Sequence, residues 1–598
     1  MRSHRALVLG IVTVAFGGLL LAPASARTFS HAAETRGAGA APVSKLKAGS
    51  VTGTSVTLSW ANPTRRGFTG SMVRYTKGKT PPSTVRSGKL GGKVGARRHT
   101  LIVGGLAKAT TYSFSVFALY RSGGPAKPVS VTVRTRTRIL TGVLSVSDNS
   151  NEACALFTNH RVDCWGLNIN NNLGSGVKDS FVTVPVHVRA VGGSGLLSGV
   201  QSLTTDGGGF CALMGDATLD CWGDNGDGDL GQGDSNPRTF PVVVKGVGAK
   251  GVLKNVTSVA GGSFGYCATL AAGGVVCWGS NFEGALGSHT SVVSSSSPVR
   301  AVGTDGTGTL SGAASVIRSG YQTCALMTAD GGLDCWGRNF SYSAPAVDVP
   351  FRIPGVGGSG FLTGVSQVQL HGDSMCAVLD GGGLDCWGVN SSGVLGTGQL
   401  SASSDTPVPV LGEGGTGTLG GVQRIVGDGA TTCAMLAGGH VDCWGNGSSG
   451  QLGQGGAPGT FSGVPLPVAG VGGAGTLTGA TTIAINFGSV CAVLSSGAVV
   501  CWGNNTFGGL GNGTNTGPIV CGACNATPSI AKGLTGTGPL GAVDQLVSND
   551  VNRVGGGGYY AVTSTGGVDF WGSGTQFTGV FGTFPQNDPS RYATPAAE

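Results

Sequence analysis

The stretch CALMGDATLDCWGDNGDGDLGQG, residues 211–233, places two cysteines ten positions apart and follows the second with Trp-Gly. The same order returns at Cys164-Trp165, Cys277-Trp278, Cys335-Trp336, Cys386-Trp387, Cys443-Trp444 and Cys501-Trp502, and Phe570-Trp571 is an eighth copy. Successive tryptophans are separated by 51 to 69 residues, most by 56 to 58. A period of this length is typical of a propeller or another repeat array.

Each unit predicts four short strands. An apolar segment such as Val256–Val259 comes first, the segment around the first cysteine is second, and the Cys-Trp-Gly segment is third. A segment such as Pro241–Val244 follows as the fourth, and Gly-rich turns separate them all. Four strands per unit, repeated in series, predict the blades of a β-propeller.

The pattern Trp-Gly-x-Asn-x-x-Gly-x-Leu-Gly, as at Asn281 to Gly287 and Asn390 to Gly396, resembles the RCC1-type repeat (regulator of chromosome condensation), in its secreted bacterial type. The resemblance covers residues 141–583 and implies an all-β fold with an RCC1-like β-propeller, usually of seven blades. The fourth unit lacks Gly-x-Leu-Gly after Trp336, and the eighth has only a weak fourth strand. Seven and eight four-stranded blades therefore both remain open, and residues 584–598 are expected to be a C-terminal tail.

The cysteines fit disulfides within units. On a hairpin, residues ten positions apart can lie opposite each other, close to the separation that a disulfide needs. The eighth unit replaces both cysteines together, by Tyr560 and Phe570, as a bridge within the unit predicts. Nine or ten intervening residues, with no histidine that recurs beside the pairs, argue against zinc. The expected bridges are Cys154–Cys164, Cys211–Cys221, Cys267–Cys277, Cys324–Cys335, Cys376–Cys386, Cys433–Cys443 and Cys491–Cys501, with a local one at Cys521–Cys524.

Three further features have structural and functional interpretations. The recurrent tryptophans are expected to pack between blades. Asp224, Asp227 and Asp229 resemble a calcium loop but lack an EF-hand register, so a plain turn is the alternative and no metal site is assigned. An aspartate precedes the second cysteine in six units and is expected on a solvated rim: Asp163, Asp220, Asp334, Asp385, Asp442 and Asp569.

The N-terminus predicts export. Arg2 and Arg5 precede an apolar run that ends near Ala24-Ser25-Ala26, so residues 1–26 are typical of a signal peptide. The run is short for a membrane span, and we expect no transmembrane anchor. A secreted, extracellular protein, with association with the cell envelope left open, agrees with paired cysteines.

The segment before the repeats is strongly basic. Residues 31–140 contain 19 Lys+Arg and one acid, whereas residues 141–598 contain 15 Lys+Arg and 28 acids. Residues 41–137 follow a linker at 27–40 and resemble a fibronectin type III β-sandwich in Trp60, Leu106, Tyr112, Phe114, Val116 and Ala118. This sandwich is either a spacer or a module that docks onto an anionic envelope polymer. No aromatic residues alternate with the basic ones, so nucleic acid is not expected as a partner.

No catalytic motif or cofactor motif accompanies these folds. The chain has no Gly-x-Ser-x-Gly elbow, His-Glu-x-x-His or P-loop. The sequence favours a secreted non-catalytic interaction protein that binds an extracellular protein or glycan through loops such as residues 288–298 and 400–407. An extracellular hydrolase or lyase acting on surface polymers is the alternative. Guanine-nucleotide exchange, an activity of some RCC1 family members, is a weaker one because export removes the GTPase partner.

Overall fold

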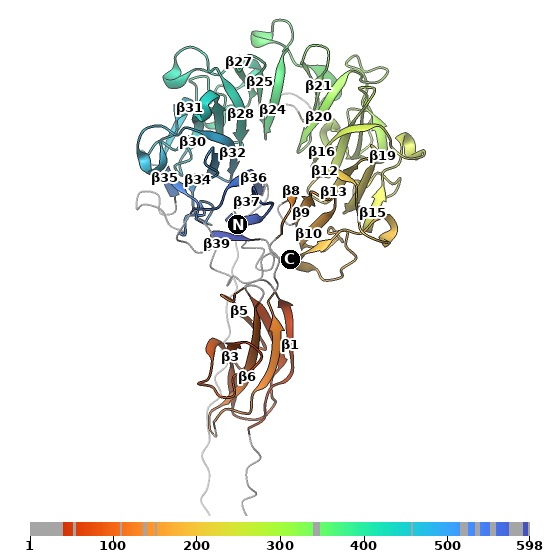
Figure 1. Cartoon of the computed structure of the whole chain (residues 1–598). Helices are drawn as coiled ribbons and strands as arrows, with labels where there is room; N and C mark the ends of the chain where they lie inside the picture. The colour runs from red at the N-terminus through yellow and green to blue at the C-terminus, as the bar shows by residue number, and fades with distance from the viewer. Residues whose placement is uncertain are drawn as a thin grey trace, which may run out of the picture.

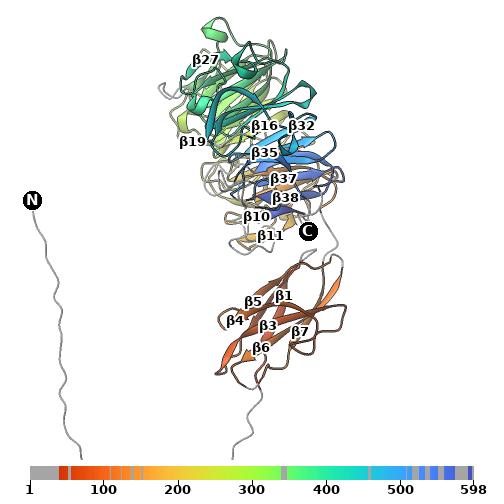
Figure 2. The same cartoon turned by 90° about the vertical axis from the view of Figure 1, so that its left-hand side faces the viewer.

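The fold is known from a computed structural model. It describes residues 40–51, 55–107, 110–122, 124–135, 140–149, 152–338, 347–455, 459–506, 508–514, 524–532, 539–549, 558–572 and 590–595. The expected signal peptide and nearly all of the linker lie outside these residues. Two all-β bodies follow each other along the chain, a small sandwich and a large ring (Figure 1, Figure 2).

The sandwich pairs a three-stranded sheet with a four-stranded sheet. The first has the order β1-β2-β5 and the second β4-β3-β6-β7. The strands are β1 (Ser44–Val51), β2 (Val56–Ala61), β3 (Phe68–Lys77), β4 (Lys89–Gly95), β5 (Thr100–Val103), β6 (Thr111–Tyr120) and β7 (Val129–Arg134). Trp60, Phe114 and Val116 are buried between the sheets, and the Tyr112 hydroxyl accepts a bond from the Ala107 amide at 2.9 Å.

The described residues after the sandwich contain eight four-stranded sheets, each made of four consecutive strands. The sheets are β8 (Val143–Asp148), β9 (Glu152–Phe157), β10 (Val162–Leu167), β11 (Phe181–His187); β12 (Val200–Thr205), β13 (Gly209–Met214), β14 (Leu219–Gly223), β15 (Arg238–Val243); β16 (Val256–Gly262), β17 (Gly265–Leu270), β18 (Val275–Ser280), β19 (Ser294–Arg300); β20 (Ala313–Ser319), β21 (Gln322–Met327), β22 (Leu333–Gly337), β23 (Val347–Arg352); β24 (Val365–His371), β25 (Ser374–Leu379), β26 (Leu384–Gly388), β27 (Ser404–Pro409); β28 (Val422–Gly427), β29 (Thr431–Leu436), β30 (Val441–Gly447), β31 (Thr460–Pro467); β32 (Ala480–Asn486), β33 (Ser489–Leu494), β34 (Val499–Asn504), β35 (Cys524–Ile530); β36 (Val543–Asn549), β37 (Gly558–Thr563), β38 (Val568–Gly572), β39 (Ser590–Pro595).

The sheets close into a ring. The first strand of each sheet lies innermost and contacts the first strand of the next, and β36 and β37 contact β8 (Figure 1). At the closure, the rings of Trp165 and Tyr560 meet edge to face with centroids 6.1 Å apart. The described sheets are therefore the blades of an eight-bladed propeller, which settles the blade count that the sequence left open.

The eighth blade corrects the expected tail. Residues 584–598 were expected to lie outside the propeller, but β39 pairs with β38 through Gly572↔Ser590, Phe570↔Thr594 and Asp569↔Pro595. The missing fourth strand of the last unit is thus supplied by residues further along the chain. Backbone pairing completes the sheet even though this segment lacks the Pro-Val pattern of the other units.

The repeated tryptophans pack between blades, as expected. All eight are fully buried. The indole of Trp278 donates to the carbonyl of Asp229 in the preceding blade at 2.8 Å, and Trp444 donates to Val394 in the same way at 2.8 Å. The glycine that ends the Leu-Gly motif makes room for this ring, because a Cβ on Gly287 would lie 2.6 Å from the Trp336 nitrogen.

Short 3-10 turns complete the propeller. They are η1 (Val191–Gly193), η2 (Val247–Ala249), η3 (Phe282–Gly284), η4 (Val356–Gly358), η5 (Ser391–Gly393), η6 (Glu413–Gly415), η7 (Ala437–Gly439) and η8 (Val471–Gly473). Because neighbouring strands are antiparallel, the loops between first and second strands and between third and fourth strands lie on one face. We call this face the loop face. β8 begins on the opposite face, so the chain enters the propeller there.

Candidate functional site

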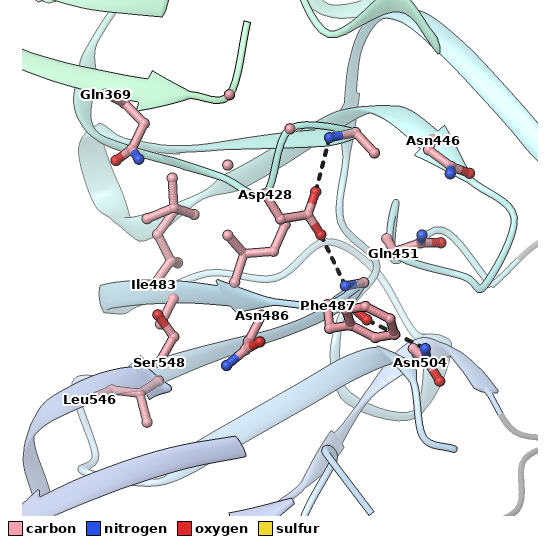
Figure 3. Close-up of a pocket in the computed structure, with 18 of the residues that line it drawn as sticks. Gln369, Asp428, Asn446, Gln451, Ile483, Asn486, Phe487, Asn504, Leu546 and Ser548 are labelled. Carbon is pink, nitrogen blue, oxygen red and sulfur yellow. Dashed lines mark hydrogen bonds between the residues drawn. The ribbon is translucent and has the colours of Figure 1, made fainter. Parts of the chain in front are cut away.

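A hollow lies at the centre of the propeller, on the loop face. It has a volume of about 830 Å³ and receives residues from six blades. We call it the channel hollow. Most of its lining comes from β24, β28, β32 and β36 and their loops, and includes Gln369, Asp428, Asn446, Gln451, Ile483, Asn486, Phe487, Asn504, Leu546 and Ser548 (Figure 3).

The one carboxylate among the described residues that line the channel hollow is already engaged. One oxygen of Asp428 accepts hydrogen bonds from the amides of Ala430 at 3.1 Å and Thr431 at 2.9 Å. The other accepts from the amide of Gly488 at 2.9 Å, which belongs to the next blade (Figure 3). Asp428 therefore links two blades, and three backbone amides hold its carboxylate in place.

An aromatic ring stands at the edge of the channel hollow. Phe487 is 53% exposed and its backbone has a φ of 45°, a conformation that bulky residues rarely adopt. The Asn504 amide donates to its carbonyl at 3.3 Å, and Asp428 holds the following residue, Gly488. An exposed ring among amide and hydroxyl groups provides one apolar surface and several hydrogen-bonding groups, which suits binding of a polar, uncharged chain.

A second hollow on the loop face has an apolar edge. Its volume is about 580 Å³, and we call it the loop hollow; its lining includes Asp227, Asn281, Phe282, Glu283, Val292, Val293 and Asp348. Val293 is 84% exposed, Phe282 57% and Val292 49%. The ring of Phe282 rests against Tyr321 of the next blade, with centroids 4.8 Å apart. A concave surface with this much exposed apolar area is typical of an interaction site.

The apolar edge of the loop hollow is fixed by its own backbone. The Asn281 side chain donates to the carbonyl of Val292 at 2.8 Å, and the Asn281 amide donates to the carbonyl of Val293 at 2.8 Å. The side-chain oxygen of Asn281 also accepts from the Leu286 amide at 3.0 Å. Asn225, Asn390 and Asn505 brace the equivalent loops in the same way. The sequence contained this asparagine in its repeat pattern but gave it no role.

Three carboxylates from three blades border the loop hollow. They belong to Asp227, Glu283 and Asp348. Arg338 offsets part of this charge, with its guanidinium 3.8 Å from Glu283 and 3.0 Å from Asp373. The loop at residues 288–298, expected from the sequence to contact a partner, supplies Val292 and Val293; its C-terminal part is strand β19. The other expected loop, residues 400–407, continues into strand β27.

The structure joins seven cysteine pairs, all within blades. In each pair the cysteines face each other on the second and third strands, with Cα atoms 4.0 to 4.1 Å apart. The bridges are Cys154–Cys164, Cys211–Cys221, Cys267–Cys277, Cys324–Cys335, Cys376–Cys386, Cys433–Cys443 and Cys491–Cys501. In the eighth blade Tyr560 and Phe570 face each other at this position, with ring centroids 4.8 Å apart. The Cys521–Cys524 bridge lies outside the described residues because Cys521 does.

The calcium candidate is not assembled. Asp224 accepts bonds from the amides of Asn225 at 2.7 Å and Gly226 at 3.3 Å, which makes it part of a turn. Asp229 is buried, and Asp227 lines the loop hollow. Among the described residues, no three His, Cys, Asp or Glu side chains are grouped so that they could hold a metal ion.

The aspartates before the second cysteine are not on a solvated rim, and that expectation was wrong. Asp163, Asp220, Asp334, Asp385 and Asp442 are all buried, and Asp569 is half-buried. Partners differ from blade to blade. Asp163 bonds His187, Asp334 lies 3.2 Å from Arg352, and neither carboxylate oxygen of Asp442 has a hydrogen-bond partner. Burial raises the pKa of Asp442 to about 7.

A buried charge cluster joins three blades. Arg318 on β20 is only 6% exposed and donates to the Ser280 carbonyl at 3.4 Å. The buried carboxyl groups of Asp206 and Asp229, both from the second blade, attract its charge. Desolvation raises the pKa of both carboxyls, although one Asp206 oxygen accepts from the amides of Gly208 and Gly209. The sequence spacing gave no sign of this cluster.

The geometry thus defines a fibronectin-like sandwich followed by an eight-bladed propeller with hollows on its loop face. Residues 41–132, which form the sandwich, match the family model of the fibronectin type III domain. Similar solved structures include yeast RCC1 (Prp20) bound to Kap60, at 18% identity over 63% of this chain and 82% of that chain, with a TM-score of 0.44. Human WBSCR16 is 18% identical, with 72% of this chain and 89% of that chain covered and a TM-score of 0.42. The ectodomain of the Physcomitrella patens receptor kinase CR4 is 17% identical, with 61% and 74% covered and a TM-score of 0.31.

Among the described residues, no helix has the length and apolar character needed to cross a bilayer.

Proposed function

We propose that the protein is a secreted, non-catalytic interaction protein whose propeller binds an extracellular protein through the loop hollow. The observation that carries this proposal is the apolar edge of that hollow, formed by Phe282, Val292 and Val293. Burying these side chains against a partner releases water from apolar surface that the free protein exposes. The bracing by Asn281 supports the proposal, because a surface already held in shape loses little entropy on binding.

A glycan is the second candidate ligand, at the channel hollow. The exposed ring of Phe487 can stack on a sugar face, while the side chains of Asn446, Gln451 and Ser548 offer donors and acceptors around it. A neutral chain suits this hollow because Arg424 and Asp428 are the charged residues in its described lining.

The three amide hydrogen bonds of Asp428 favour a structural role for this carboxylate over a catalytic one at the channel hollow. A hydrolase or lyase needs a carboxylate or another base that can exchange a proton with the substrate. Asp428 instead accepts three hydrogen bonds from backbone amides. Guanine-nucleotide exchange stays the weaker alternative, because a secreted protein does not meet a cytosolic GTPase.

The cysteines support an extracellular location. Seven bridged pairs are expected for a chain that folds in an oxidising compartment. We propose secretion through the signal peptide at residues 1–26, with the basic sandwich as a spacer or envelope-docking module.

The test uses matched valine substitutions. The secreted protein, immobilised, captures partners from culture medium and envelope extracts, and the affinity for each captured protein is then measured. We expect Val292→Asp with Val293→Asp to weaken binding at least about tenfold, because two charges would be buried in the interface. Val356→Asp is the control, since Val356 is 46% exposed and lies on the opposite face. Equal affinity in both variants would remove the loop hollow as the binding site.

Two further measurements separate the alternatives. Binding to a panel of neutral glycans, lost in Phe487→Ala, would assign the channel hollow to glycan binding. Release of product from the same panel would instead support the enzyme alternative and contradict a non-catalytic role.

A further inference from the structure

The sandwich carries an excess of positive charge, and part of it is concentrated on three loops. Residues 41–135 contain 16 Lys+Arg and no Asp or Glu. Five of these cations are arginines on three loops: Arg65 and Arg66 between β2 and β3, Arg97 and Arg98 between β4 and β5, and Arg121 after β6. All five residues are exposed. We call this group the arginine end.

Hydrogen bonds hold the three loops together. The Asn62 amide donates to the carbonyls of Ala96 at 3.0 Å and Arg98 at 3.1 Å, which ties the first loop to the second. Trp60 fixes Asn62 by donating to its side-chain oxygen at 2.9 Å. The Arg121 amide donates to the Gly67 carbonyl at 3.0 Å, which ties the third loop to the first. The backbones that carry the five guanidinium groups are therefore held together on one small surface.

The arginine end is the end of the sandwich far from the propeller. The chain leaves the sandwich at Arg134, which pairs with Thr111 at the start of β6. Arg121 follows the other end of β6, ten residues away along a straight strand. The Tyr120 hydroxyl also donates to the Ala41 carbonyl, so the N-terminal entry of the chain lies beside the arginine end.

The chemistry of this surface selects phosphate. Arginine keeps its charge at any physiological pH and offers a planar fork that bonds two oxygens of a phosphate at once. Five like charges on one small surface repel one another, and residues 41–135 contain no carboxylate. A polymer with repeated phosphates would relieve that repulsion and release its own counterions.

Two observations argue against other anionic surfaces. The large apolar side chains exposed in the described sandwich are Leu90 and Ile102, and Leu90 pairs with Arg74, toward the propeller end. The arginine end therefore has no apolar side chain to insert into a lipid bilayer. Its described residues expose no Phe, Tyr or Trp side chain, and the single exposed ring of His99 is too little for a platform on which successive nucleic acid bases would stack.

We infer that the arginine end binds an extracellular polymer with repeated phosphate groups and thereby anchors the protein with its propeller directed away. This inference deepens the envelope-docking role that we proposed for the sandwich, and it is independent of the loop hollow.

The experiment measures binding of the full secreted protein to inorganic polyphosphate as a function of salt. One variant changes Arg65, Arg66, Arg97 and Arg98 to Gln. The matched control removes four charges elsewhere on the sandwich by changing Lys47, Lys77, Lys79 and Lys89 to Gln. Thermal unfolding of each variant confirms that the sandwich is still folded.

We expect the arginine variant to bind at least about tenfold more weakly near 0.15 M salt, and the slope of log K against log salt to fall by about 3. The lysine control is expected to change affinity by less than about threefold, since its charges lie outside the proposed contact. Equal losses in the two variants would mean attraction by net charge alone and would overturn the site.

Other anionic ligands are tested with the same protein variants. Tighter binding to vesicles of anionic phospholipid, to heparin or to a single-stranded oligonucleotide than to polyphosphate would overturn the assignment of the ligand. Partner capture through Val292 and Val293 is measured in parallel. Loss of polyphosphate binding with partner capture intact supports the inference, whereas loss of partner capture alone concerns only the proposed function of the propeller.

Discussion

We expect the substitution Arg318→Met to weaken the contact among three blades and so to destabilise the propeller. The guanidinium is 6% exposed and faces the buried carboxyl groups of Asp206 and Asp229. Methionine has a similar reach and would fill much of the space, so the main loss is the positive charge. Removing one partner of a buried ionic group leaves uncompensated charge and costs about 3 to 5 kcal/mol. We expect the free energy of unfolding to fall by about that amount at pH 8.

The loss of stability in Arg318→Met should be larger at pH 8 than at pH 5. Desolvation already raises the folded pKa of Asp206 and Asp229 above the unfolded value, and removing Arg318 raises it further. The folded state then holds protons that the unfolded state releases, so stability falls as pH rises from the unfolded toward the folded pKa. At pH 5 both carboxyls of Arg318→Met can be neutral, and the penalty should be smaller than at pH 8.

Denaturant unfolding, followed by tryptophan fluorescence at both pH values, measures the effect. Asp206→Asn and Asp229→Asn in the Arg318→Met background should recover part of the loss at pH 8, because they remove the charge left unpaired. In the wild-type background the same changes serve as controls and complete a double-mutant cycle. A penalty of equal size at pH 5 and pH 8, together with no recovery, would refute this electrostatic account.

Three further perturbations test other contacts. Burial raises the pKa of Glu152 to about 8, so Glu152→Gln should remove the loss of stability between about pH 4.5 and pH 8, and unchanged pH slopes would contradict this. Trp444→Phe loses the 2.8 Å bond to the Val394 carbonyl and should cost about 1 to 3 kcal/mol in denaturant unfolding, whereas no loss would mean that the bond contributes little. Replacing Cys376 and Cys386 by Ala together should lower the free energy of unfolding by about 2 to 3 kcal/mol, with no free thiol detected; a stability equal to wild type would argue against this bridge as a staple.

The sequence predicted the repeated parts of the fold because they are local. Strand pairing across a short turn depends on neighbouring residues, and the joint absence of cysteine at Tyr560 and Phe570 already indicated that these positions face each other. The tryptophans were predicted between blades because a large ring beside glycine at one fixed position needs a repeated cavity.

Features that depend on the assembled ring could not be predicted in this way. Alternation placed Asp442 on the face opposite Cys443, but it gave no information about what covers that face, so the aspartate was wrongly expected in solvent. Asp428 and Gly488 are 60 residues apart and meet because two blades are adjacent. The last strand, β39, was missed because pairing with β38 is specified by the backbone rather than by a residue pattern.

The contiguity of each blade bears on how the chain can mature. Every sheet of the propeller uses four strands that are consecutive in sequence, and every described bridge joins cysteines only 10 or 11 residues apart. Short loops close fastest, so each thiol meets its own partner before the cysteines of the next blade arrive. Oxidation can therefore proceed from the N-terminus as the polypeptide emerges, with little mispaired material for an isomerase to repair. The contacts that close the ring, between β8 and the strands β36 and β37, must wait for the last blade.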